Sequence, residues 1–130
     1  EAFLRTAPVP VALVTGNHDR RWRPTGAVST IRGRYFFHHG DTSPPVPAGL
    51  LEVIGHHHPA VSWWDGAGAS VKLPALVATP QRLVLPAFSP WAAGTPWTAT
   101  AGSPETLWAV APSRIFSVPH VGSLQPTSAA

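Results

Sequence analysis

The sequence predicts a strand-rich α/β fold with little helix. Short apolar runs recur along the chain, such as V-A-L-V-T at 11–15 and L-L-E-V-I-G at 50–55, and their length is typical of strands. The 11 Gly and 16 Pro residues separate these runs with turns and loops. Three of the runs end in polar clusters that contain histidine. Layered α/β folds assemble sites beyond the C-terminal ends of their strands, and the clusters fit that pattern.

The first half of the chain begins with residues 1–6, which we expect to be the end of a helix that Pro8 and Pro10 close. Residues 11–15 are continuously apolar and β-branched, which predicts a strand buried on both faces. Residues 31–39 (I-R-G-R-Y-F-F-H-H) are expected to form another strand.

The second half consists of strands and hairpins. Residues 50–55 predict a strand, and 61–79 predict a hairpin around D-G-A-G. Residues 81–88 predict a further strand, and 89–97 a Pro/Gly-rich loop with exposed Trp91 and Trp97. Residues 106–118 predict two strands joined by the turn A-P-S-R.

Composition limits the function classes. The 130 residues make one domain or part of one, and 44% hydrophobic residues with six Trp supply a core. The absence of Cys excludes disulfides and thiolate zinc sites. The charge of +3 is mild, so a solvated basic face explains it better than nucleic-acid binding. Without an apolar run of about 20 residues we expect no membrane span, and we expect a cytoplasmic location.

The polar clusters are G-N-H-D at 16–19, H-H-G-D at 38–41 and G-H-H-H at 55–58, and together they hold six of the seven His residues. Imidazole and amide ligands without sulfur suit Mn, Fe or Zn. A single His beside an apolar run is most often a hydrogen-bonded surface residue, and we interpret His38 and His120 in this way. Three such clusters, each ending a strand, favour a metal site.

The G-H-H-H segment allows a finer prediction. On an extended backbone alternate side chains point to opposite faces, so His56 and His58 would share a face and His57 would point elsewhere. The two same-face residues could then reach two metals that are about 3.5–4 Å apart. His57 would face solvent or substrate.

The motifs V-T-G-N-H-D, H-G-D and G-H-H-H resemble the third, fourth and fifth signature blocks of the calcineurin-like metallophosphoesterases. The phrases K-L-P-A-L, R-L-V-L-P-A-F-S-P-W-A-A-G and L-W-A-V-A-P-S-R-I-F-S-V resemble the DNA-ligase-associated branch of bacterial enzymes, linked to DNA repair. The resemblance implies a four-layer α/β/β/α sandwich, two divalent metal ions (Mn foremost, Fe or Zn otherwise) and a phosphate-ester substrate, which in this branch includes DNA. It also implies a functional link to a DNA ligase.

The resemblance assigns roles to individual residues. Asn17, His39 and His56 match ligands of the second metal, and His58 matches a ligand of the first. His18 matches the histidine that faces the scissile phosphate and protonates the leaving oxygen. Asp19 would hold the His18 imidazole by a hydrogen bond.

Two family blocks, D-x-H and G-D, are absent from the chain, and the D-G pair at 65–66 comes too late and is interpreted as a hairpin turn. The missing blocks supply the bridging carboxylate and most ligands of the first metal. The chain also has no Met and opens with E-A-F-L-R-T. We therefore expect a partial domain at 1–120, a polar tail at 121–130 and a missing N-terminal part. We expect this segment alone to be weak or inactive.

Two alternatives stay open. One is a non-catalytic nucleic-acid-binding module in which Trp91, Trp97 and nearby basic residues stack on bases. The other is an inactive gene fragment. Metal dependence separates the first of these from a phosphoesterase, because a chelator would abolish catalysis and spare nucleic-acid binding.

Overall fold

The computed structural model describes residues 6–21, 26–64, 66–89, 92 and 94–122. These residues form nine strands and, apart from the helical residue Thr6, one short 3-10 helix, η1. The elements are η1 (Asn17–Arg21), β1 (Ser29–Arg32), β2 (Tyr35–His38), β3 (Leu51–Ile54), β4 (Pro59–Trp64), β5 (Ser70–Ala78), β6 (Arg82–Val84), β7 (Thr95–Pro96), β8 (Thr106–Ala111) and β9 (Arg114–Val118). None of the helical segments within this part of the chain has the length and apolarity that crossing a membrane requires.

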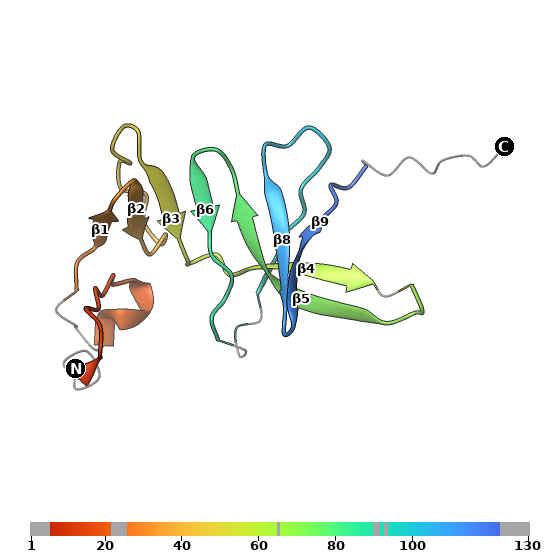
Figure 1. Cartoon of the computed structure of the whole chain (residues 1–130), viewed down its shortest axis with the longest axis horizontal. Coiled ribbons are helices and arrows are strands. Elements are labelled where there is room, and N and C mark those ends of the chain that lie inside the picture. The colour runs from red at the N-terminus through yellow and green to blue at the C-terminus, as the bar shows by residue number, and fades with distance from the viewer. Residues whose placement is uncertain (1–5, 22–25, 65, 90–91, 93, 123–130) are drawn as a thin grey trace.

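The strands form a mixed sheet in the order β1-β2-β3-β6-β5-β4-β7, with β8 also paired to β5 and β9 to β8 (Figure 1). Strands β2, β3 and β6 are parallel neighbours. The β1–β2, β4–β5 and β8–β9 pairs are antiparallel hairpins. The described residues therefore form a strand-rich mixed sheet with almost no helix, which confirms the coarse prediction of the fold.

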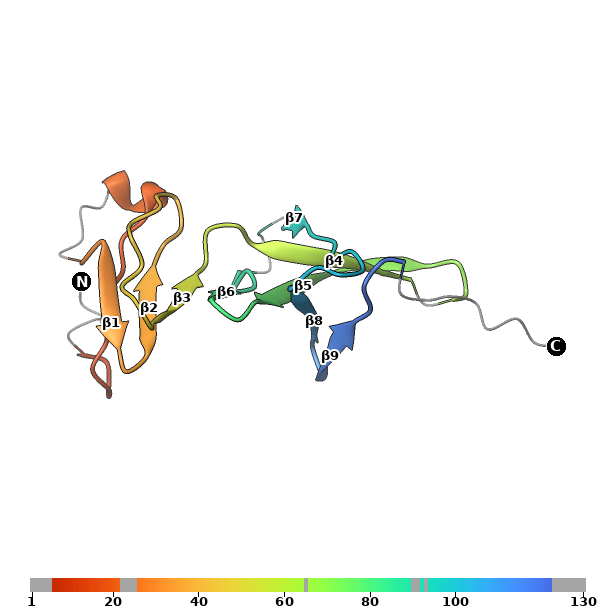
Figure 2. The ribbon, with the colours of Figure 1, turned by 90° about the horizontal axis from the view of Figure 1, so that it is seen from above.

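Strand β5 belongs to two parts of this sheet. Its first half, up to Pro74, pairs with β4, and its second half, from Ala75 on, pairs with β8. Figure 2 shows the β4–β5 hairpin running out beyond β8 and β9. Because one continuous strand joins both parts, Val61 of β4 lies in the same buried cluster as residues of β5, β6 and β8.

The hydrophobic core lies where these parts meet. Ala75 and Ala109 are opposite each other in the β5–β8 register and are fully buried. Their small side chains leave room for larger neighbours, among them Leu107, which is 2% exposed. The buried cluster contains Ile54, Val61, Ala75, Val77, Val84, Ala99, Leu107 and Ala109.

A buried polar network connects the three parallel strands. The Glu52 carboxylate on β3 accepts a hydrogen bond from His38 Nε2 on β2 at 2.8 Å and another from Arg82 Nε on β6. Glu52 and His38 are 6% and 5% exposed. Burial raises the pKa of Glu52, but the hydrogen bonds from Arg82 and then His38 outweigh it, so the pKa is lowered below its ordinary value.

Several predicted elements are confirmed. Residues 50–55 contain β3, the predicted hairpin at 61–79 is formed by β4 and β5, and 106–118 form β8 and β9. The expected strand at 81–88 is present as the shorter β6. The predicted loop at 89–97 contains β7, which pairs with Pro59 and Ala60 of β4.

Two predicted strands are wrong. Residues 31–39 are not one strand, because Gly33 adopts a φ of 57° and turns the chain from β1 into β2. Residues 11–15 are not buried on both faces: Val11 is 44% exposed, and the described pairing there is one bridge between Val14 and Ala27. Burial of both faces of a strand requires a layer packed on each face, and the exposed Val11 shows that such cover is incomplete here.

The terminal predictions fall largely outside the described residues. This holds for residues 1–5 of the expected helix end and for residues 123–130 of the expected tail. Val121, the first residue of that expected tail, pairs with Thr100 in a parallel bridge.

Acid unfolding tests the buried network. The native pKa of Glu52 is lowered, so the unfolded chain takes up more protons as the pH falls below about 5. The network therefore contributes stability at higher pH and loses it as the pH falls through the native pKa. Urea unfolding of Glu52→Gln at pH 7 should show a free energy of unfolding lower by about 1–3 kcal/mol. The gap to the wild type should narrow from about pH 5 to pH 3; a gap that stays constant would contradict this account.

Candidate functional site

The last two polar clusters follow neighbouring parallel strands. Strands β2 and β3 pair with Phe37 opposite Val53, so the segments after them leave the same edge of the sheet. The carbonyl oxygen of His39 accepts hydrogen bonds from Gly55 N at 3.1 Å and His56 N at 2.9 Å. These two bonds hold the backbone of the third cluster directly against that of the second.

Side chains of all three clusters then converge. His39 Nε2 lies 3.0 Å from Asn17 Oδ1 and 3.1 Å from His56 Nδ1. The ring nitrogen carries either one hydrogen or one lone pair. If His39 Nε2 carries a hydrogen, that hydrogen is shared between Asn17 Oδ1 and His56 Nδ1. If it carries a lone pair, that lone pair faces the lone pairs of Asn17 Oδ1. A cation bound between the three atoms would accept a lone pair from each of them.

The spacing of these atoms fits a metal ion. Ligands that are about 2.1 Å from a metal and at right angles to each other are about 3.0 Å apart. The distances of 3.0 and 3.1 Å at His39 Nε2 match that value. The set is two imidazoles and one amide oxygen; among the described residues, no three His, Cys, Asp or Glu side chains form a metal-binding group. Asn17, His39 and His56 could thus supply three positions of a wider coordination sphere.

Two glycines make room for this arrangement. A Cβ on Gly16 would lie 2.3 Å from Cγ and Cδ2 of the His39 ring, far inside van der Waals contact. Gly40 has a φ of 104°, and a Cβ there would come within 3.2 Å of His56 Cβ. The first glycine lets the Asn17 segment pass against the His39 ring, and the second lets the chain turn beside His56.

The electrostatics favour neutral imidazoles. Burial lowers the pKa of His39, and the nearby His56 and His18 add to this effect, whereas Asp41 and Asp19 oppose it. Partial desolvation also lowers the pKa of His57, although the residue is exposed, with smaller contributions from His56 and Arg82. A lowered pKa keeps the His39 ring unprotonated near neutral pH, which is the form that binds metals.

The two predicted catalytic residues lie beside this convergence. The exposed His18 ring stands edge-on to His39, with 6.4 Å between ring centroids. Asp19 Oδ2 accepts a hydrogen bond from Gly16 N at 2.8 Å and so closes the turn at the start of η1. Within the described part of the chain, Asp19 has no hydrogen bond to His18, and its role in holding that ring stays a prediction.

The extended backbone predicted for G-H-H-H is wrong. Residues 56–57 form a turn, and His58 has a φ of 45°, because the chain here leaves β3 and enters β4 in the other part of the sheet. The His58 carbonyl accepts a hydrogen bond from Thr95 N at 2.8 Å. The side chain of His58 has no hydrogen bond to a described residue, and its role as a metal ligand stays a prediction.

Two interpretations of single residues need correction. His38 was expected at the surface but is buried against Glu52. Trp97 was expected to be exposed but packs partly buried against the core and donates from Nε1 to Glu105 Oε2 at 3.2 Å. Trp91 lies outside the described residues. The half-buried, hydrogen-bonded His120 agrees with its prediction, since its Nε2 lies 2.6 Å from the Glu105 carbonyl oxygen.

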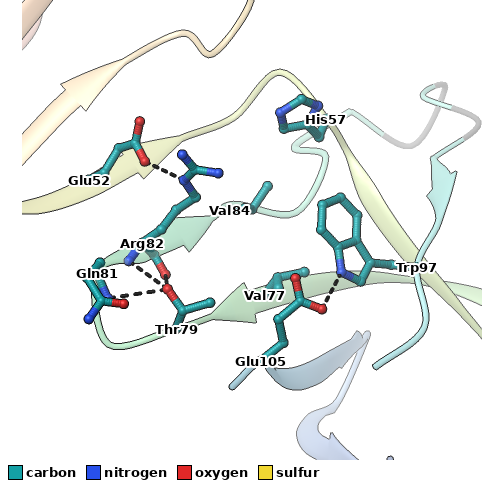
Figure 3. A pocket seen from close by; sticks show the side chains of 9 residues that line it. All are labelled: Glu52, His57, Val77, Thr79, Gln81, Arg82, Val84, Trp97 and Glu105. Carbon is teal, nitrogen blue, oxygen red and sulfur yellow. Dashed lines mark hydrogen bonds and ion pairs between the residues drawn. The ribbon is translucent and has the colours of Figure 1, made fainter. Parts of the chain in front are cut away.

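Sequence reasoning missed a pocket of about 280 Å³ between the two parts of the sheet (Figure 3). Its lining residues are Glu52, His57, Val77, Thr79, Gln81, Arg82, Val84, Trp97 and Glu105. The one signal available was the charged Glu52 inside the apolar run L-L-E-V-I. The remaining members lie on β5 and β6 or beside β3, β6, β7 and β8, and only the pairing of these strands brings them together.

Comparison with known proteins supports the fold. No protein-family model matches the chain, and no curated protein sequence matches it. Among solved structures, the chain is similar to the Pseudomonas putida nuclease MPE, with a TM-score of 0.60 and 24% sequence identity. The match covers 83% of this chain and 53% of the nuclease chain, so the chain spans about half the length of that protein.

Substitution of Gly16 tests the convergence. Gly16→Ala places a methyl group against the His39 ring and should move the ring away from Asn17 and His56. We expect the affinity for Mn²⁺ or Zn²⁺, measured by isothermal titration calorimetry, to fall about 10- to 100-fold. Gly55→Ala is the matched control, because a Cβ there meets nothing within 4 Å. Equal affinities of the two variants would argue against the site.

Proposed function

We propose that the chain is the C-terminal part of a metal-dependent phosphoesterase of the phosphodiesterase or DNA endonuclease type. The observation that carries the proposal is the convergence of Asn17 Oδ1, His39 Nε2 and His56 Nδ1 from three separate motifs. Sites that join histidines and an amide oxygen at one edge of a sheet are suited to hold a divalent ion.

Two further observations support the proposal. The motifs that contain these residues resemble blocks of the calcineurin-like metallophosphoesterases, and the chain's fold resembles that of a nuclease. On this basis we also propose the four-layer α/β/β/α sandwich for the whole protein, with DNA or another phosphate ester as substrate. The proposed membership of the DNA-ligase-associated branch, the link to a DNA ligase and the cytoplasmic location rest on the sequence alone.

In the proposed site Asn17, His39 and His56 hold one divalent ion, with Mn foremost and Fe or Zn as alternatives. The family pattern adds a second ion, for which His58 is the proposed ligand in this chain. Such ions lower the pKa of a bound water and offset the charge that develops on the phosphoryl group.

The chain's own residues supply binding, orientation and proton transfer. His39 stays neutral because burial lowers its pKa, and its backbone carbonyl holds the His56 backbone in place. His18 is exposed beside His39 and is free to approach a substrate from solvent. We propose that it donates a proton to the leaving oxygen. Asp19 holds the turn on which His18 is carried.

Cleavage assays test this function. The complete product of the gene's reading frame should hydrolyse bis-p-nitrophenyl phosphate or single-stranded DNA with Mn²⁺ and lose this activity in EDTA. His18→Ala should lower kcat about 10²- to 10⁴-fold because the proton donor is lost. It should leave Mn²⁺ affinity unchanged, since His18 is outside the converging set. His56→Ala should lose metal binding as well.

A histidine outside the converging set serves as the control. His120 lies against the Glu105 carbonyl, and His120→Gln should keep both metal affinity and kcat. Full activity of His56→Ala, or activity that persists in EDTA, would overturn the metal-dependent mechanism. Chelator-resistant DNA binding without cleavage would favour the nucleic-acid-binding alternative. The 130-residue chain alone is expected to be weakly active or inactive.

A further inference from the structure

The pocket between the two parts of the sheet has features of a ligand site that the metal chemistry does not use. Its floor is apolar, with buried Val77 on β5 and Val84 on β6. Figure 3 shows the Arg82 guanidinium directed from one wall toward His57, and Trp97 with Glu105 on the opposite wall. An apolar floor with a few polar groups that converge above it is typical of small-molecule sites.

The polar groups offer both donors and an acceptor. Arg82 uses Nε to hold Glu52, and its Nη atoms have no partner among the described residues. Glu105 Oε2 accepts from Trp97 Nε1, and Glu105 Oε1 is without a hydrogen bond in the same part of the chain. One wall can therefore donate two parallel hydrogen bonds, and the other can accept from an N–H group.

The pocket also presents aromatic faces. The rings of His57 and Trp97 lie 6.2 Å apart between centroids and are inclined at 56° to each other. The indole of Trp97 is held by its hydrogen bond to Glu105, so it loses little freedom when a ligand stacks on it. Stacking of a flat ring on such side chains is a main source of affinity for nucleobases.

The size and position of the pocket restrict the kind of ligand that it can bind. About 280 Å³ is near the lower end of the range for ligand pockets, so one small ring system fits and a longer oligomer does not. The pocket adjoins the proposed metal site, because the His57 ring lies 5.5 Å from that of His56. This position suits a base attached to a phosphate that is bound at the proposed metal site.

We propose that the pocket binds a guanine base of the substrate, with Arg82 on its acceptor edge and Glu105 on its amino edge. Guanine presents two adjacent acceptors, O6 and N7, which match paired Arg donors. Its N1–H and amino group match a carboxylate. Adenine has an amino group where Arg82 would donate. The link to a cleaved phosphate rests on the proposed function, whereas binding of the base does not.

The test uses guanosine, which has no phosphate, in EDTA, so that neither the metal nor a phosphate site contributes. Binding of guanosine, adenosine and cytidine to the 130-residue chain would be followed by NMR titration of the indole N–H signals. We expect the Kd for guanosine to be at least about 5-fold below those of the other two nucleosides. The signal of Trp97, assigned with Trp97→Phe, should shift most.

Two variants probe the walls, and one serves as control. His57→Ala removes an exposed ring, and Glu105→Gln keeps an acceptor for Trp97 but removes the charge. Each should raise the Kd for guanosine at least about 5-fold. Trp64→Phe changes a Trp that is 65% exposed on the β4–β5 hairpin and is not a lining residue, and it should leave the Kd unchanged.

The outcomes separate this inference from the proposed function. Absence of guanosine binding, equal affinity for the three nucleosides, or unchanged binding in both wall variants would overturn the pocket assignment, even if Mn²⁺-dependent cleavage is found. Guanosine binding that depends on His57 and Glu105 would support the assignment, even if the complete gene product fails to cleave phosphate esters.

Discussion

The candidate site depends on one backbone constraint, the double hydrogen bond that the His39 carbonyl accepts from Gly55 N and His56 N. It fixes the segment after β3 against the segment after β2. Because the two strands are parallel and in register, their following residues leave the sheet at the same edge. This constraint and the strand register bring together His39 and His56, which are 17 positions apart in the chain.

Two glycines shape this edge of the sheet because they have no side chain. Gly16 and Gly40 leave space that the His39 ring and the His56 Cβ occupy, so His39 Nε2 approaches Asn17 Oδ1 and His56 Nδ1 to about 3 Å. Beneath them the buried Glu52 connects β2, β3 and β6 through His38 and Arg82. A buried carboxylate is stable only when it is paired. A change in the register of β2, β3 or β6 would separate Glu52 from His38 or Arg82, so the network favours the observed register.

The shared strand β5 explains why a pocket exists at all. Because β5 passes from β4 to β8, two parts of the sheet diverge from it, and the space between them is lined by residues from both. Trp97 reaches this space from the segment after β7, and Arg82 reaches it from β6. The pocket therefore unites side chains that no local motif brings together. Its position beside His57 makes the proposed base site and the proposed metal site neighbours.

The sequence by itself determined the local elements and the chemistry available. The hairpins at 61–79 and 106–118 and the strand at 50–55 were predictable, because apolar runs and turn residues act over a few positions. The three histidine clusters and their ligand types were also visible. The prediction of a single strand at 31–39 was wrong, because Gly33 has a left-handed backbone conformation and turns the chain.

Only the tertiary structure decided which side chains meet. It brought His39 together with Asn17 and His56, buried His38, placed His58 in a left-handed turn and built the pocket around Arg82 and Trp97. Each of these depends on strand pairing and on the passage from β3 to β4, which join residues far apart in the chain. Such long-range contacts leave no periodic signal in the sequence, and so they follow from the fold alone.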